Sequence, residues 1–128
     1  MVDEHQPAVV GVIEDDAGSR DALGRLLQAA GFEAALFDSA EAYVASPQDR
    51  KWRCLIVDVQ LTGMSGIDLQ RKLRAGGCDV PVIIISGNRA DSVREHAGQA
   101  GCAAFLWKPF SGETILSLLG SIARDARP

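Results

Sequence analysis

A single carboxylate at the end of an apolar run is the strongest chemical signal in this sequence. The run is Cys54–Val57, and the carboxylate that follows it is Asp58. A short run rich in β-branched residues, without polar alternation, is typical of a strand buried on both faces of a parallel sheet. Because ligands of open α/β sheets bind outside the carboxyl ends of the strands, Asp58 is predicted to face a ligand. Alternatively, Asp58 caps the next helix, although Ser65 and Gly66 lie closer to that helix and can cap it themselves.

Three of the other apolar runs also end in residues that can do chemistry. These residues are Glu14 and Asp15 after the first run, Ser86 after the fourth and Lys108 after the fifth. If the strands are parallel, their carboxyl ends share one edge of the sheet and these side chains converge. Clustered carboxylates either hold protons or bind a hard divalent cation such as Mg²⁺ or Mn²⁺. An ammonium and a hydroxyl beside them suit the oxygens of a phosphoryl group.

Taken singly, each of these residues has a structural alternative. The acidic residues 14–16 can open the first helix, where negative charge complements the helix dipole. Ser86 can be an ordinary turn residue, and Lys108 an exposed lysine before a proline turn. Their joint placement after four strands favours a common site.

The elements that must position these residues alternate regularly along the chain. The expected strands are 8–13, 32–37, 54–57, 80–85 and 103–107, and helical patterns fall at 20–30, 40–45, 67–75, 90–100 and 115–122. Five strands alternating with five helices predict an α/β fold, with a parallel sheet between two helical layers. The second strand is followed only by a capping pair, Asp38 and Ser39, which indicates an edge position.

Length and composition predict one globular domain over residues 1–128, with its core at about 8–123. Apolar residues make up 47% of the 128 residues, and the net charge is -4 without a basic cluster. Nucleic-acid binding is not expected, because the cationic surface that drives it is missing. No apolar run can span a membrane and no signal peptide is evident, so we expect a soluble, cytoplasmic protein without membrane contact. Its three cysteines form no CxxC motif, as expected in a reducing compartment.

Over residues 9–122 the chain resembles the receiver domain of two-component response regulators. The motifs that carry the resemblance are Val12–Asp16, Leu55–Leu69, Ile83–Gly87 and Phe105–Phe110. The resemblance implies a flavodoxin-like, doubly wound fold with five parallel strands in the order 2-1-3-4-5 and five helices. It also implies a phosphoacceptor switch that assists its own phosphorylation and dephosphorylation, rather than a conventional enzyme.

The resemblance further implies a role for each site residue. Asp58 accepts a phosphoryl group from a phosphohistidine on a sensor histidine kinase or phosphotransfer protein, and Lys108 neutralises the phosphoryl oxygens. The remaining assignments are Mg²⁺ (or Mn²⁺) binding by Asp15, Asp58 and the Gln60 backbone carbonyl, assistance through water by Glu14, and a switch made by Ser86 and Phe105. The Ser86 hydroxyl swings toward the phosphoryl group, and Phe105 fills the space it leaves. The Lys108–Pro109 bond is expected to be cis.

Output is expected through the surface of the fourth helix, fifth strand and fifth helix, toward a downstream protein partner. The chain is expected to be a stand-alone receiver, with a fragment of a larger regulator as the alternative. The sequence leaves open whether phosphorylation causes weak dimerisation.

The chain departs from the family pattern at three positions. Thr62 stands where proline is usual, so the loop after Asp58 loses a backbone constraint. Phe105 replaces the commoner tyrosine and has no hydroxyl to donate. Gly87 stands where alanine is frequent, which opens access to Asp58. Gln60 matches a position that tunes self-dephosphorylation in the family, as Asn88 does.

Two other functions fit parts of the sequence. A haloacid-dehalogenase-type phosphatase uses an aspartate nucleophile in an Asp-x-Asp-x-Thr motif, which Asp58–Thr62 approaches. Gln60 removes the second acid, which that chemistry needs as a general acid and base. A flavodoxin-like electron carrier must cradle a phosphate in its first loop, where residues 14–16 are acidic and repel one.

Overall fold

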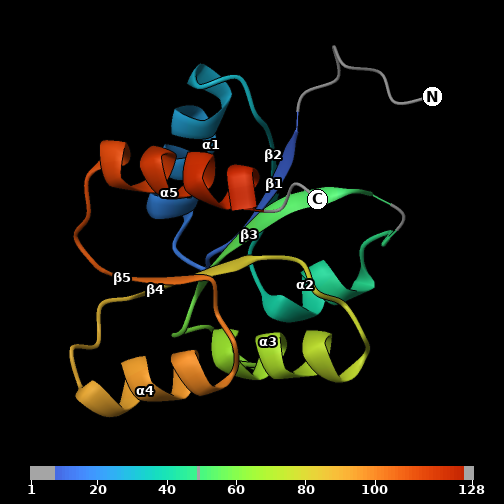
Figure 1. Cartoon of the computed structure of the whole chain (residues 1–128), viewed down its shortest axis with the longest axis vertical. Helices are drawn as coiled ribbons and strands as arrows, with labels where there is room; N and C mark the ends of the chain where they lie inside the picture. The colour runs from blue at the N-terminus through green and yellow to red at the C-terminus, as the bar shows by residue number, and fades with distance from the viewer. Residues whose placement is uncertain (1–7, 49, 126–128) are drawn as a thin grey trace.

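The described residues of this computed structural model, 8–48 and 50–125, form a five-stranded parallel sheet between two helical layers (Figure 1). The strands are β1 (Val9–Ile13), β2 (Glu33–Phe37), β3 (Trp52–Asp58), β4 (Val82–Ser86) and β5 (Ala104–Trp107). The helices are α1 (Ala17–Ala29), α2 (Ala40–Ala45), α3 (Gly66–Ala75), α4 (Asp91–Gln99) and α5 (Gly112–Asp125). The strand order is β2-β1-β3-β4-β5, which confirms the predicted doubly wound topology and the edge position of β2.

Four helices begin at a side-chain cap that the sequence makes recognisable. Asp16, Ser39, Ser65 and Ser111 each accept a hydrogen bond from the backbone N–H three residues later, at 2.8, 3.0, 3.1 and 3.2 Å. Such caps satisfy N–H groups that the first turn of a helix leaves without partners. Ser65 therefore caps α3, and Asp58 does not serve that purpose.

Each face of the sheet has its own apolar core. Helices α1 and α5 cover one face, and α2, α3 and α4 cover the other (Figure 1). Alternate residues of β3 enter opposite cores, with Leu55 and Val57 on one side and Cys54 and Ile56 on the other. This double burial is why the strand reads as a continuous apolar run. Burial raises the pKa of the Cys54 thiol to about 12, consistent with its expected place in the core.

Helix α4 follows its expected apolar pattern except at its ends. The pattern at 90–100 is formed by Ala90, Val93, Ala97 and Ala100, of which Ala97 and Ala100 are buried and Val93 packs against the same core. Ala90 precedes the helix and is exposed, and Ala100 lies just beyond its end, so the helix itself is shorter than the pattern. None of the helices in the described ranges is long and apolar enough to cross a membrane.

Candidate functional site

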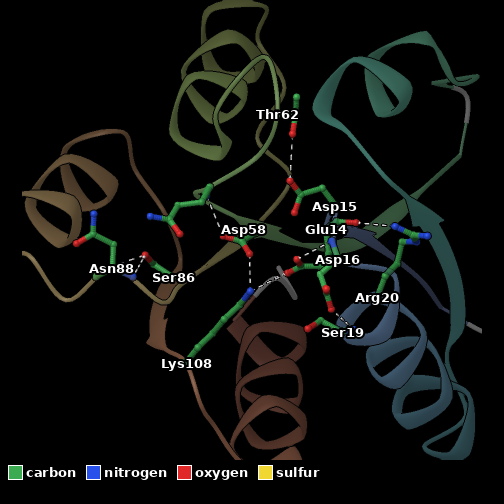
Figure 2. A network of polar contacts seen from close by, with 11 residues as sticks. Glu14, Asp15, Asp16, Ser19, Arg20, Asp58, Thr62, Ser86, Asn88 and Lys108 are labelled. Carbon is green, nitrogen blue, oxygen red and sulfur yellow. Dashed lines mark hydrogen bonds and ion pairs between the residues drawn. The ribbon is translucent and has the colours of Figure 1, made fainter.

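Three of the predicted site residues meet at the carboxyl edge of the sheet. Asp58 ends β3 at the centre of the sheet, Glu14 follows β1 and Lys108 follows β5. The Lys108 ammonium donates to Glu14 Oε2 at 3.0 Å and to Asp58 Oδ2 at 2.5 Å (Figure 2). Both carboxylates are nearly inaccessible, with 1% of Glu14 and 4% of Asp58 exposed. One cation thus joins two buried acids from two other strands.

Lys108 reaches these acids because the end of β5 is fixed to β4. The Lys108 N–H donates to the Ser86 carbonyl at 2.8 Å, and the Lys108–Pro109 bond is cis, as predicted. Strand β4 lies between β3 and β5, so the long lysine side chain passes the end of β4 to reach Asp58. A flexible four-carbon stem suits this span.

The electrostatics of the site follow from burial and from this shared cation. Burial, followed by the neighbouring Asp58 carboxylate, raises the pKa of Glu14 above its ordinary value, although Lys108 opposes the shift. Burial alone lowers the pKa of Lys108, but its hydrogen bonds to Asp58 and Glu14 outweigh that effect and raise it. Lys108 therefore stays charged at neutral pH, whereas the ionised form of Glu14 is disfavoured.

The Asp58 carboxylate is held at both oxygens. Oδ2 accepts from Lys108, and Oδ1 accepts from the backbone N–H of Gln60 at 2.8 Å. Behind it, Gly66 packs directly on the Asp58 backbone, and a Cβ at Gly66 would lie only 2.9 Å from the Asp58 carbonyl carbon. The first turn of α3 can approach the acceptor strand so closely only because residue 66 has no side chain.

Asp15 is not drawn into the contact that Lys108 makes. It is exposed and points toward Thr62, whose hydroxyl donates to Asp15 Oδ2 at 3.4 Å (Figure 2). Among residues 8–48 and 50–125, no group of three or more His, Cys, Asp or Glu side chains is arranged to hold a metal ion. The three consecutive acids therefore have different partners. Glu14 bonds Lys108 beside Asp58, Asp15 faces the loop after β3, and Asp16 caps α1.

Ser86 lies on β4, the strand next to the acceptor strand, and Phe105 lies on β5, one strand further out. Ser86 ends β4 and is fully buried, and its Oγ accepts from the Asn88 N–H at 3.0 Å. Phe105, on β5, is half-buried and packs edge to face with Trp107, with ring centroids 4.7 Å apart. Ser86 is therefore near the acceptor but bonded to its own loop, and the proposed swing of its hydroxyl stays a prediction.

Two charged residues beside the site were not singled out from the sequence. Arg89 donates to the Lys108 carbonyl at 3.1 Å, and its guanidinium lies 5.7 Å from the Trp107 ring centroid. Glu41, on α2, accepts from the Met64 N–H at 2.9 Å. Both look like ordinary exposed charges in the sequence, since their partners are distant along the chain.

The chain matches the family model described as the response regulator receiver domain over residues 10–120. It is 34% identical over 117 residues to the transcriptional regulatory protein FixJ of Bradyrhizobium diazoefficiens, covering 91% of this chain and 57% of FixJ. It is 35% identical over 114 residues to the response regulator protein TmoT of Ectopseudomonas mendocina, covering 89% of this chain and 52% of TmoT. The chain spans about half the length of these curated relatives.

Solved structures agree with the family match. Full-length FixJ from B. japonicum superposes with a TM-score of 0.88 at 32% identity, covering 96% of this chain and 61% of that one. The structure titled FixJ-N superposes with a TM-score of 0.85 at 28% identity, covering 96% of this chain and 98% of that one. The phosphatase and electron-carrier alternatives find no support in these matches. The chain therefore belongs to the response regulator receiver domains, which are phosphoacceptor switches of two-component signalling rather than conventional enzymes.

Proposed function

We propose that Asp58 is the residue that accepts the phosphoryl group. The observation that carries this assignment is the buried Asp58 carboxylate at the end of the central strand, held by Lys108 at one oxygen and by the Gln60 N–H at the other. Preorganised donors of this kind stabilise the charge that develops during phosphoryl transfer. Covalent attack by a carboxylate is an established role for aspartate.

In the proposed reaction, an Asp58 oxygen attacks the phosphorus of a phosphohistidine on the donor protein. The O–P bond of an acyl phosphate forms as the N–P bond breaks. The donor imidazole keeps the electron pair of the broken bond and is protonated from solvent. The Lys108 ammonium, already 2.5 Å from Asp58 Oδ2, neutralises charge on the transferred oxygens.

Receiver domains typically use Mg²⁺, and Mn²⁺ is the alternative ion. We propose Asp15, Asp58 and the Gln60 carbonyl as the metal ligands, with Glu14 assisting through water. The donor set fits, because all four groups offer the hard oxygen atoms that these ions prefer. The convergence of Glu14 and Asp58 on one ammonium supports this proposal, since the site already stabilises positive charge. When bound, the ion adds charge neutralisation at the phosphoryl oxygens.

We propose that the phosphodonor approaches over a groove beside the acceptor. This groove, with a volume of about 550 Å³, is lined by Glu14 and Lys108 and by apolar residues of α1 and of the segment before α5, among them Leu23, Leu26 and Phe110. An apolar surface continuous with the acceptor site suits a sensor kinase or phosphotransfer protein, which must bind while its histidine reaches Asp58.

We further propose that residues 1–128 form one receiver domain, with its core at about 8–123. Output passes to a downstream protein through α4, β5 and α5; the proposal is supported by the place of Ser86 at the end of β4, next to the acceptor strand, and of Phe105 on β5, which belongs to that surface. The absence of nucleic-acid and membrane contacts, weak phosphorylation-dependent dimerisation and a cytoplasmic location stay predictions.

The assignment of Asp58 is tested by labelling with acetyl phosphate, with and without Mg²⁺. We expect wild type and Asp21→Asn, which changes an exposed aspartate on α1, to gain one phosphoryl group by mass spectrometry. Asp58→Asn should gain none. Equal labelling of Asp58→Asn and wild type would place the acceptor elsewhere.

A further inference from the structure

The loop between β3 and α3, residues 59–65, connects the phosphoacceptor to a neighbouring helix. Its first part donates the Gln60 N–H to Asp58 Oδ1, and its last part contacts Glu41 of α2. We propose that Glu41 is a positioning residue for phosphoryl transfer. It restrains this loop, which lacks the proline usual at position 62. The inference rests on the proposed role of Asp58.

The contact between Glu41 and the loop is close and directional. Glu41 Oε2 accepts from the Met64 N–H at 2.9 Å, across 23 positions of sequence. The same oxygen lies 2.5 Å from the position that a Cβ at Gly63 would occupy, so the carboxylate rests against the loop backbone. A hydrogen bond to an ionised carboxylate is about twice as strong as one between neutral groups.

Glu41 is supported by a well-anchored helix. The N-cap of α2 is Ser39, and its buried residue Tyr43 packs edge to face on Phe37 with ring centroids 5.4 Å apart. Tyr43 is 1% exposed, which fixes the helix against the sheet. A side chain on such a support can restrain a loop more effectively than one on another loop.

The loop needs this restraint because of its own sequence. Gly63 has a φ of 85°, and glycine is the residue with the greatest backbone freedom. Thr62 lacks the ring that would fix φ, and its hydroxyl makes only a long contact of 3.4 Å to Asp15. Without Glu41, the loop would sample more conformations and present the Gln60 N–H to Asp58 less often. Small losses of alignment at a reacting group reduce rates severalfold or more.

The test measures the rate at which acetyl phosphate phosphorylates Asp58 at saturating Mg²⁺, so that an effect on metal affinity does not contribute. We expect Glu41→Ala to be slower than wild type by about three- to tenfold, the range that corresponds to the typical net contribution of one hydrogen bond. Glu41→Gln keeps an oxygen that can accept from Met64 and should recover at least half of the loss. Glu95→Ala removes the same charge from an exposed position on α4 and should match wild type.

A compensating change distinguishes positioning from general destabilisation. Adding Thr62→Pro to Glu41→Ala should bring the rate to within about twofold of wild type, because the ring restrains the loop directly. The Thr62 N–H donates no hydrogen bond within the described residues, so proline removes none. Thr62→Pro alone completes the double-mutant cycle, and thermal unfolding checks that each variant is folded.

The outcomes separate this inference from the proposed function. If wild type is labelled at Asp58 and Glu41→Ala is labelled at the same rate, the positioning role of Glu41 is wrong. The same conclusion follows if a folded Glu41→Ala, Thr62→Pro protein stays as slow as Glu41→Ala, or if Glu41→Gln is as slow as Glu41→Ala. If wild type itself is not labelled at Asp58, the proposed function fails instead.

Discussion

The Lys108 ammonium donates a hydrogen bond to Asp58 Oδ2, although the two residues stand 50 positions apart in the chain. The same ammonium bonds Glu14, so one side chain is the common partner of two acids that are almost fully buried. Burying an acid without a partner is costly, whereas a shared cation with well-formed hydrogen bonds offsets that cost. The stability of the fold and the chemistry of the site thus depend on the same contact.

Replacing Lys108 should therefore destabilise the protein. In Lys108→Ala, Glu14 and Asp58 lose their common cation and face each other across the site. We expect the free energy of unfolding at pH 7 to fall by about 1–3 kcal/mol, less than for a fully buried pair because Lys108 is partly exposed. Urea unfolding of Lys108→Ala and of Lys51→Ala, which changes an exposed lysine, measures the difference. Equal stability of the two variants would mean that the shared cation contributes little.

Glu14 should make stability depend on pH in a defined direction. Its pKa in the folded protein is raised, so the favourable contribution of its protonated form is complete below about 4.5 and is lost as pH rises through the folded pKa. Glu14→Gln does not titrate and should gain stability relative to wild type as pH rises from 4.5 to 7. Urea unfolding across that range, with a chelator present, gives the comparison. A difference that stays constant or shrinks with rising pH contradicts this prediction.

Two glycine substitutions should have opposite effects. In Gly66→Ala, the new Cβ meets the Asp58 backbone and Val57 Cγ1, the latter at 2.9 Å, and we expect a loss of about 1–3 kcal/mol. In Gly120→Ala, the Cβ meets nothing within 4 Å on a helical surface, and we expect a gain of about 0.5–1 kcal/mol. Thermal unfolding of both variants checks the signs. A neutral Gly66→Ala would show that α3 can move away from the acceptor strand.

The parts of the fold that local sequence determines were predicted well. The bounds 40–45 of α2 and the cap of α3 at Ser65 follow from residue types that prefer these positions. The edge position of β2 follows from the absence of chemically useful residues at its end. By contrast, α4 is shorter than its apolar pattern, because Ala90 and Ala100 satisfy the helical period from positions just outside the helix.

The residues of the site were predicted from the sequence, but the contacts between them were not. That Glu14, Asp58 and Lys108 meet follows from parallel strands ending at one edge. Spacing does not determine side-chain directions. It therefore could not predict that Lys108 bonds both acids or that Asp15 points to Thr62. The contact between Glu41 and Met64 was not predicted, because it depends on how α2 packs beside the loop after β3.

The positions of the two tryptophans have a practical consequence. Trp52 begins β3 and Trp107 ends β5. The first therefore lies at the amino ends of the parallel strands and the second at their carboxyl ends. Trp107 pairs in register with Ser86 and immediately precedes Lys108, whereas Trp52 is at the far edge from Asp58. The protein thus carries one native fluorophore next to Lys108 in the chain and a second one, at the start of β3, that can serve as an internal reference for optical titrations.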